Sequence, residues 1–190
     1  MITLKKGDIF MTDNFSTASN IVKFLMQEKT LWLHVWKVIT FQKLNEVRFY
    51  HVGMVLDQDR MIEQQSKVKI SDTSNIFKKN YVIWRKKTLT EEDRNTLELL
   101  ALNDLEEGYG VLECIGKTIS WLTGIKWFCK WFDMKDNAIC AIRTAEWYKL
   151  AVGETFGETN PNYLTTDKID EWCEKYPVEW ECIDINYKEE

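Results

Sequence analysis

A histidine, a carboxylate and a cysteine stand in settings that suit covalent chemistry. His51 lies in a strand-like run, 48–56, which is followed by a short polar turn and by Glu63. Cys140 lies far downstream, at the expected start of a helix. In such a set the thiolate attacks a carbonyl carbon, the imidazole transfers the proton and the carboxylate orients the imidazole. The pattern predicts a nucleophilic cysteine site.

The connection between two expected strands, 47–56 and 60–65, decides which side chain orients the imidazole. With a three-residue connection, Glu63 shares a face with His51 and lies one diagonal away, roughly 7–8 Å between backbones. A two-residue turn shifts the register and places Gln64 there instead. We choose Glu63 as the orienting residue and keep Gln64 as the alternative.

The expected position of Cys140 in its helix favours a reactive sulfur. Asn137 can cap a helix over 138–151, which places Cys140 in the first turn. Free backbone N–H groups and the helix dipole stabilise a thiolate there, and a nearby imidazolium lowers the thiol pKa further. The backbone N–H of Cys140 can also donate to the oxyanion of a tetrahedral intermediate.

The remaining histidine and cysteines are interpreted as structural. His34 lies in a tryptophan-rich setting, and a cysteine is usually a small core residue. An odd number of irregularly spaced cysteines indicates reduced thiols and not a disulfide framework, and the sequence has neither CxxC nor HExxH. We therefore expect no metal site and no cofactor. The cysteines assigned to the core are Cys114, Cys129, Cys173 and Cys182.

Length and composition predict one globular domain over 1–190. The net charge of −5 argues against nucleic acid as a partner. The first residues lack the apolar stretch of a signal peptide, and no apolar run is long enough to span a bilayer, so a cytoplasmic protein is the default expectation. The sequence does not indicate an oligomeric state.

The hydrophobic periodicity predicts strands and helices that are segregated along the chain more than they alternate. This order favours an α+β fold. Besides the two strands and the helix above, the expected strands are 4–11, 81–85 and 180–185, and the expected helices are 17–28, 91–105 and 115–132.

The segment 115–132 has apolar residues at helical spacing, with lysines and tryptophans among them. Ordinary core packing is the first interpretation. The alternative is a lid or groove for an acyl chain, or a contact with a membrane surface, because lysine and tryptophan together suit an interface.

Six stretches between about residues 6 and 164 resemble permuted papain-like cysteine hydrolases of the NlpC/P60 superfamily, in particular the YiiX-like branch. In chain order they are similar to that family's opening strand, histidine strand, third-position strand, Gly-x-x-Tyr stretch, nucleophile helix start and late proline segment. These stretches are Lys6–Phe10, Phe49–Val55, Met61–Glu63, Glu107–Tyr109, Asn137–Cys140 and Pro161–Leu164.

The resemblance implies a small antiparallel sheet or barrel packed against helices, and a catalytic set of Cys140, His51 and Glu63. It also implies that Tyr109 shapes the pocket or assists the oxyanion. Family members often have Cys-Ser-Glu at the nucleophile, whereas this chain continues with Ala141 and Ile142. The departure bears on the substrate class more than on the reaction class.

The expected function is that of a cysteine amidase or peptidase, which cleaves an amide bond through an acyl-enzyme. A peptide-type amide, such as a cell-wall stem peptide, is the first expectation for the substrate. Two alternatives remain. One is a lipid acyl hydrolase or acyltransferase of the same fold, and the other is a binding module without turnover.

Overall fold

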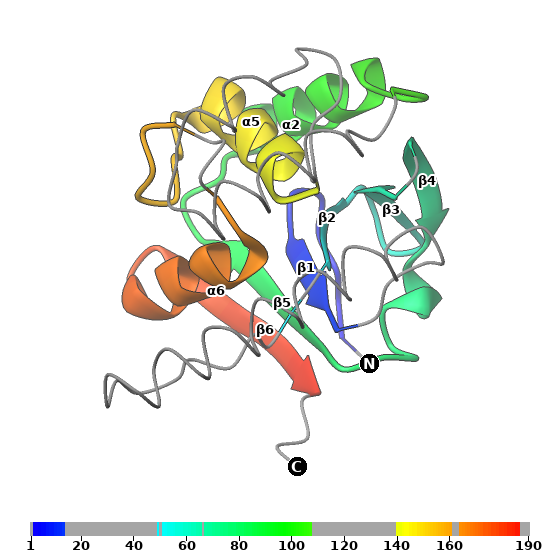
Figure 1. Cartoon of the computed structure of the whole chain (residues 1–190), viewed down its shortest axis with the longest axis horizontal. Helices are drawn as coiled ribbons and strands as arrows, with labels where there is room; N and C mark the ends of the chain where they lie inside the picture. The colour runs from blue at the N-terminus through cyan, green and yellow to red at the C-terminus, as the bar shows by residue number, and fades with distance from the viewer. Residues whose placement is uncertain are drawn as a thin grey trace, which may run out of the picture.

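The computed structural model of the chain is an α+β structure in which six strands form one antiparallel sheet and three helices pack around it, counted over the described residues (Figure 1). Strand order in the sheet is β4-β3-β2-β1-β5-β6. The structure describes residues 2–13, 49, 51–65, 67–107, 140–160 and 164–186.

The strands are short and differ in burial. The central strands β1 and β2 are buried along their whole length, whereas β4 and β6, at the two edges, carry several exposed residues. The strands are β1 (Ile9–Thr12), β2 (His51–Val55), β3 (Arg60–Gln64), β4 (Val68–Asp72), β5 (Tyr81–Lys86) and β6 (Trp180–Asn186).

Two of the helices lie together and the third lies near the last strand. In Figure 1, α5 and α2 are side by side, and the first turn of α5 lies next to β2. The helices are α2 (Glu91–Asn103), α5 (Cys140–Val152) and α6 (Thr166–Lys175), with a short 3-10 turn η2 (Thr73–Asn75) after β4.

The main core joins the sheet to α2 and α5. It includes Met54 of β2, Ile62 of β3, Leu97 of α2 and the large side chains of Trp147 and Tyr148 on α5, all buried. Removing this much apolar surface from water is the dominant favourable contribution to folding. The core therefore fixes α5 against β2, the strand that begins with a histidine.

The hairpin between β2 and β3 has the register that a three-residue connection predicts. Gly53 pairs with Glu63, and the Leu56 N–H donates to the Arg60 carbonyl over 2.9 Å, which leaves 57–59 as the connection. The predicted register, on which the choice of Glu63 over Gln64 depended, is thus confirmed.

Most of the expected elements that fall on described residues are present, with ends shifted by a few positions. The first strand begins at Ile9 and not at residue 4, because the chain turns at Gly7, whose φ of 82° lies in the left-handed region that favours glycine. Neither β4 nor α6 was predicted. The expected helices 17–28 and 115–132 lie outside the described residues. Over the part that is described, no helix is long and apolar enough to cross a membrane.

Candidate active site

His51 and Glu63 form a buried hydrogen-bonded pair on neighbouring strands. His51 is the first residue of β2, and its Nε2 lies 2.7 Å from the Oε2 of Glu63 on β3. The two residues are only 4% and 3% exposed. Gln64, the alternative orienting residue, is buried on the opposite face of β3, because successive side chains of a strand alternate. The geometry therefore joins the imidazole to Glu63.

A glycine next to the histidine makes room for an aromatic ring. The Phe10 ring centroid lies 6.1 Å from that of His51. A Cβ placed on Gly53 would come within 2.5 Å of Phe10 Cζ and within 2.7 Å of the Ile62 carbonyl oxygen. Only glycine fits between this ring and the backbone of β3, so the Gly53 of the histidine strand is required for the packing beside the imidazole.

Cys140 is the first residue of α5, and its thiol is hydrogen-bonded to the His51 imidazole. Since Nε2 of the ring faces Glu63, Nδ1 is the nitrogen left for the sulfur. The backbone N–H groups of Val52 and Ala141 also donate to the sulfur. Cys140 is thus the first described residue of its helix, whereas its expected cap, Asn137, lies outside the described residues.

Burial and hydrogen bonding act in opposite directions on these three groups. Burial lowers the pKa of His51, but the hydrogen bonds to Cys140 and Glu63 outweigh it and raise that pKa from 6.5 to about 9. Burial raises the pKa of Glu63, yet its bonds to His51 bring that pKa down to about 2. Burial likewise raises the pKa of the Cys140 thiol, while the His51 contact lowers it to a net value below the ordinary one. The site favours a thiolate–imidazolium pair beside a carboxylate.

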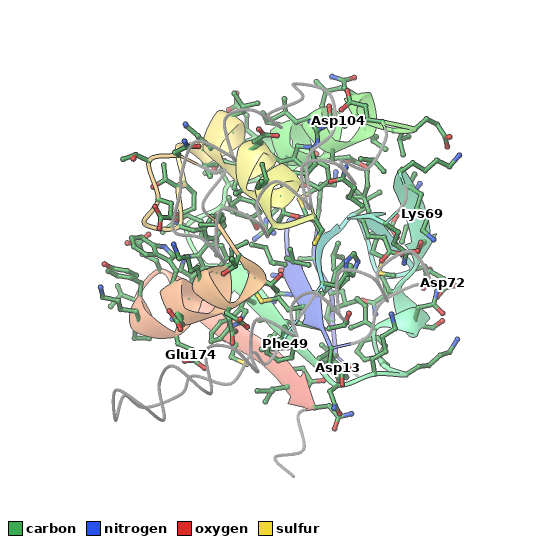
Figure 2. All side chains as sticks on the ribbon, in the orientation of Figure 1. Asp13, Phe49, Lys69, Asp72, Asp104 and Glu174 are labelled. Atoms are coloured by element: carbon green, nitrogen blue, oxygen red, sulfur yellow. The ribbon has the colours of Figure 1, made fainter. Side chains whose placement is uncertain are left out.

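An ion-pair cluster holds the helix that carries the cysteine. Arg143, one turn after Cys140, lies 3.2 Å from an Asp104 oxygen and 2.6 Å from a Glu107 oxygen. The Trp147 indole N–H donates to the same Asp104 carboxylate over 2.7 Å. Asp104, labelled in Figure 2, follows α2, so these contacts tie the first two turns of α5 to the end of α2.

The sequence did not single out the donors on the second oxygen of Glu63. Ser71 Oγ donates to Oε1 over 2.7 Å and Gln65 Nε2 donates over 3.0 Å, while Lys69 Nζ lies 3.9 Å away. Ser71 and Lys69 belong to β4, whose alternating pattern was not recognised as a strand. Tyr109 lies outside the described residues. Within the described ranges, no group of three or more His, Cys, Asp or Glu residues is arranged to hold a metal ion.

The fold has a counterpart among the solved structures. The chain is similar to the crystal structure of the metalloprotein YiiX from Escherichia coli O157:H7, with a TM-score of 0.54 and 17% sequence identity over 98% of this chain and 99% of that one. No family model matches the sequence, and neither does any curated protein. The predicted α+β fold of the YiiX-like branch is confirmed.

Proposed function

We propose that the protein is a cysteine hydrolase that cleaves an amide bond through an acyl-enzyme, with Cys140 as nucleophile, His51 as general base and acid, and Glu63 as the orienting carboxylate. The observation that carries the proposal is the continuous hydrogen-bonded series from the Cys140 thiol through the imidazole to a buried carboxylate. Two residues far apart in the sequence meet here, and their pKa values are displaced in the directions that such catalysis requires.

The reaction follows from this geometry. The thiolate of Cys140 forms a bond to the carbonyl carbon, and the C=O electron pair moves to the oxygen to give a tetrahedral oxyanion. The oxyanion collapses, the C–N bond breaks, and the imidazolium of His51 gives its proton to the departing amine. His51 then takes a proton from water, whose oxygen attacks the thioester. Collapse of the second intermediate breaks the C–S bond and releases the acid, which restores the thiolate of Cys140 beside the imidazolium of His51.

Glu63 keeps the imidazole in the orientation that this cycle needs. Its Oε2 accepts from Nε2, which directs the other ring nitrogen to the sulfur and stabilises the positive charge on the ring. As substrate we propose a peptide-type amide, such as a cell-wall stem peptide. The resemblance to the NlpC/P60 superfamily and the YiiX-like fold support this choice.

Alkylation as a function of pH tests the proposal without a known substrate. The protein is treated with iodoacetamide from about pH 5 to 9 in a buffer with a chelator, and each cysteine peptide is quantified by mass spectrometry. Cys182 is the matched control, because it is exposed. Partial desolvation and the nearby carboxylates raise its thiol pKa. We expect Cys140 to label at its full rate well below the ~8.5 of a free thiol, and Cys182 to label only as the pH rises above that value.

A second measurement distinguishes turnover from binding alone. Incubation with a panel of fluorogenic peptide amides should release the fluorophore and leave a mass increase on Cys140 when the reaction is quenched in acid. If Cys140 labels no faster in the folded protein than in urea, the proposed function is wrong. Fast labelling with neither product nor adduct from any amide would also contradict the amidase assignment.

A further inference from the structure

The Glu63 carboxylate has a second set of contacts beyond the imidazole. One oxygen, Oε2, faces Nε2 of His51, while the other, Oε1, accepts from Ser71 Oγ over 2.7 Å and from Gln65 Nε2 over 3.0 Å. The Glu63 side chain is 4% exposed, so water supplies little of the solvation that an ionised group requires. These neighbouring side chains must supply it instead.

The position of Ser71 is determined by strand pairing. Met61 pairs with Ser71 and Glu63 pairs with Lys69, so Ser71 lies diagonally across from Glu63 on the same face of the sheet. Its hydroxyl is therefore aimed at the carboxylate by the register of β3 and β4 and not by a flexible loop. A short side chain on a paired strand is well suited to hold a fixed direction.

Both ends of β4 are fastened to other parts of the protein. At the start, Val68 exchanges two backbone hydrogen bonds with the segment after α2, one to Glu107 O over 2.9 Å and one from Glu106 N over 3.0 Å. Beyond the end, the Thr73 N–H donates to Asp59 O over 3.1 Å. An edge strand held in this way cannot shift its register without breaking these bonds.

We propose that Ser71 is a positioning residue of the active site. By donating to Oε1, with Gln65 as the second donor to that oxygen, it fixes Glu63 so that the other oxygen, Oε2, points at the imidazole. The inference rests on the proposed function, because it explains how the orienting carboxylate is itself oriented. Removing one of these donors leaves a buried carboxylate short of a hydrogen bond, which makes its negative charge less favourable and weakens its hold on the imidazolium.

The pKa of His51, measured by titration, should change if Ser71 positions Glu63. It should stay the same if Ser71 has a merely structural role. The ionisable groups that act on the imidazole are Glu63 from β3 and Cys140 from α5, and Lys69 of β4 lies 3.9 Å from Glu63 Oε1. The chain has only two histidines, so NMR titration of the imidazole C–H signals in the full-length protein can be assigned with a His34→Gln variant.

The experiment compares Ser71→Ala and Ser71→Thr with Ser74→Ala. Ser74 is the matched control, because it is exposed and contacts Asp72 rather than Glu63. Ser71→Ala should lower the His51 midpoint from about 9 by half a unit to one unit and slow Cys140 labelling near pH 6 about three- to tenfold, the effect of losing roughly one hydrogen bond to a charged group. Ser71→Thr should restore both values, and Ser74→Ala should match the wild type.

The possible results separate this inference from the proposed function. If wild-type Cys140 labels quickly and depends on His51, but folded Ser71→Ala keeps the wild-type midpoint and labelling rate, only the role of Ser71 is wrong. If wild-type Cys140 labels slowly, the proposed function fails whatever Ser71 does. Should Ser71→Ala not fold, Gln65→Met removes the second donor from the same oxygen. An unchanged His51 midpoint in that variant would overturn the inference.

Discussion

Cys140 and Cys173 are both buried cysteines on helices, 6% and 0% exposed, yet their thiols lie in opposite electrostatic surroundings. Cys140 opens α5, where it meets the His51 imidazole and backbone N–H groups, and the net effect is a lowered thiol pKa. Cys173 lies near the end of α6. There burial raises its thiol pKa far above the ordinary range, and the carboxylate of Asp170 adds to the increase.

The contrast shows that burial by itself makes a thiol inert. Burial is the largest influence on the pKa of both groups and raises it in both. Only Cys140 has a hydrogen-bonding base and donors that overcome this effect, because it stands at a helix N-terminus opposite the histidine strand. The reactive thiol is therefore identified by its neighbours and not by its exposure.

Replacing each cysteine in turn gives the largest expected difference. Cys140→Ala should abolish amide cleavage, a loss of about 10³-fold or more, since it removes the nucleophile of the proposed acyl-enzyme. Cys173→Ala should keep wild-type turnover and Cys140 labelling, because Cys173 lies in the core away from the proposed reaction. Both variants are compared by hydrolysis of the peptide amide panel, after circular dichroism shows that they are folded. Equal loss in both would remove the distinction between the two thiols.

Removing the imidazole should make Cys140 resemble an ordinary buried thiol. In His51→Ala the sulfur loses the interaction that lowers its pKa. We expect alkylation near pH 6.5 to slow about 100-fold or more, because even a free thiol of pKa about 8.5 is only about 1% thiolate at that pH and burial raises the pKa further. The rate is measured by peptide mass mapping, with Cys182 as the internal reference. A rate within a factor of about two of the wild type would show that the helix N-terminus alone activates the sulfur.

The sequence predicted the central strands and the long helices because their signals are local and strong. The histidine strand has continuous apolar character, and the helix over 91–103 begins with a capping box formed by Thr90 and Asp93. Strand β4 was not predicted, because it lies at an edge of the sheet, where Ile70 is exposed and the other residues are mostly polar. Helix α6 has a cap at Thr165 but is short, so its apolar period covers fewer than three turns.

The pairing of His51 with Glu63 could be predicted for a similar reason, whereas the hydrogen bond that Ser71 donates to Glu63 could not. A three-residue connection determines the register between β2 and β3, and that register brings Glu63 to His51. The hydrogen bond from Ser71 depends on pairing with β4, which no local signal had assigned. The meeting of Cys140 with the imidazole rested on family resemblance, because the spacing of residues so distant in the chain does not determine their contact.

The two steps of the proposed reaction should respond differently to alkaline pH. The His51 pKa is raised to about 9, so the imidazolium is present below that pH and is lost above it. Amide cleavage needs the imidazolium proton for the departing amine and should fall up to tenfold per pH unit above about 9. Alkylation needs only the thiolate and should persist. Parallel profiles of cleavage and iodoacetamide labelling test this, with the Glu63→Gln variant expected to lose cleavage at a lower pH.

The smallest expected effect concerns the carboxylate beside the inert cysteine. Asp170→Asn removes a negative charge from the surroundings of Cys173 but keeps an oxygen that can accept from the Trp84 indole N–H, which donates to Asp170 over 2.7 Å. Burial, and not this carboxylate, is the largest cause of the raised Cys173 pKa, so labelling of that thiol should change by less than about twofold. Replacement of the charge-assisted hydrogen bond by a neutral one should lower the free energy of unfolding by about 1 kcal/mol, measured by urea denaturation. If Cys173 instead became reactive in the folded variant, charge repulsion would have to replace burial as the reason why the two thiols differ.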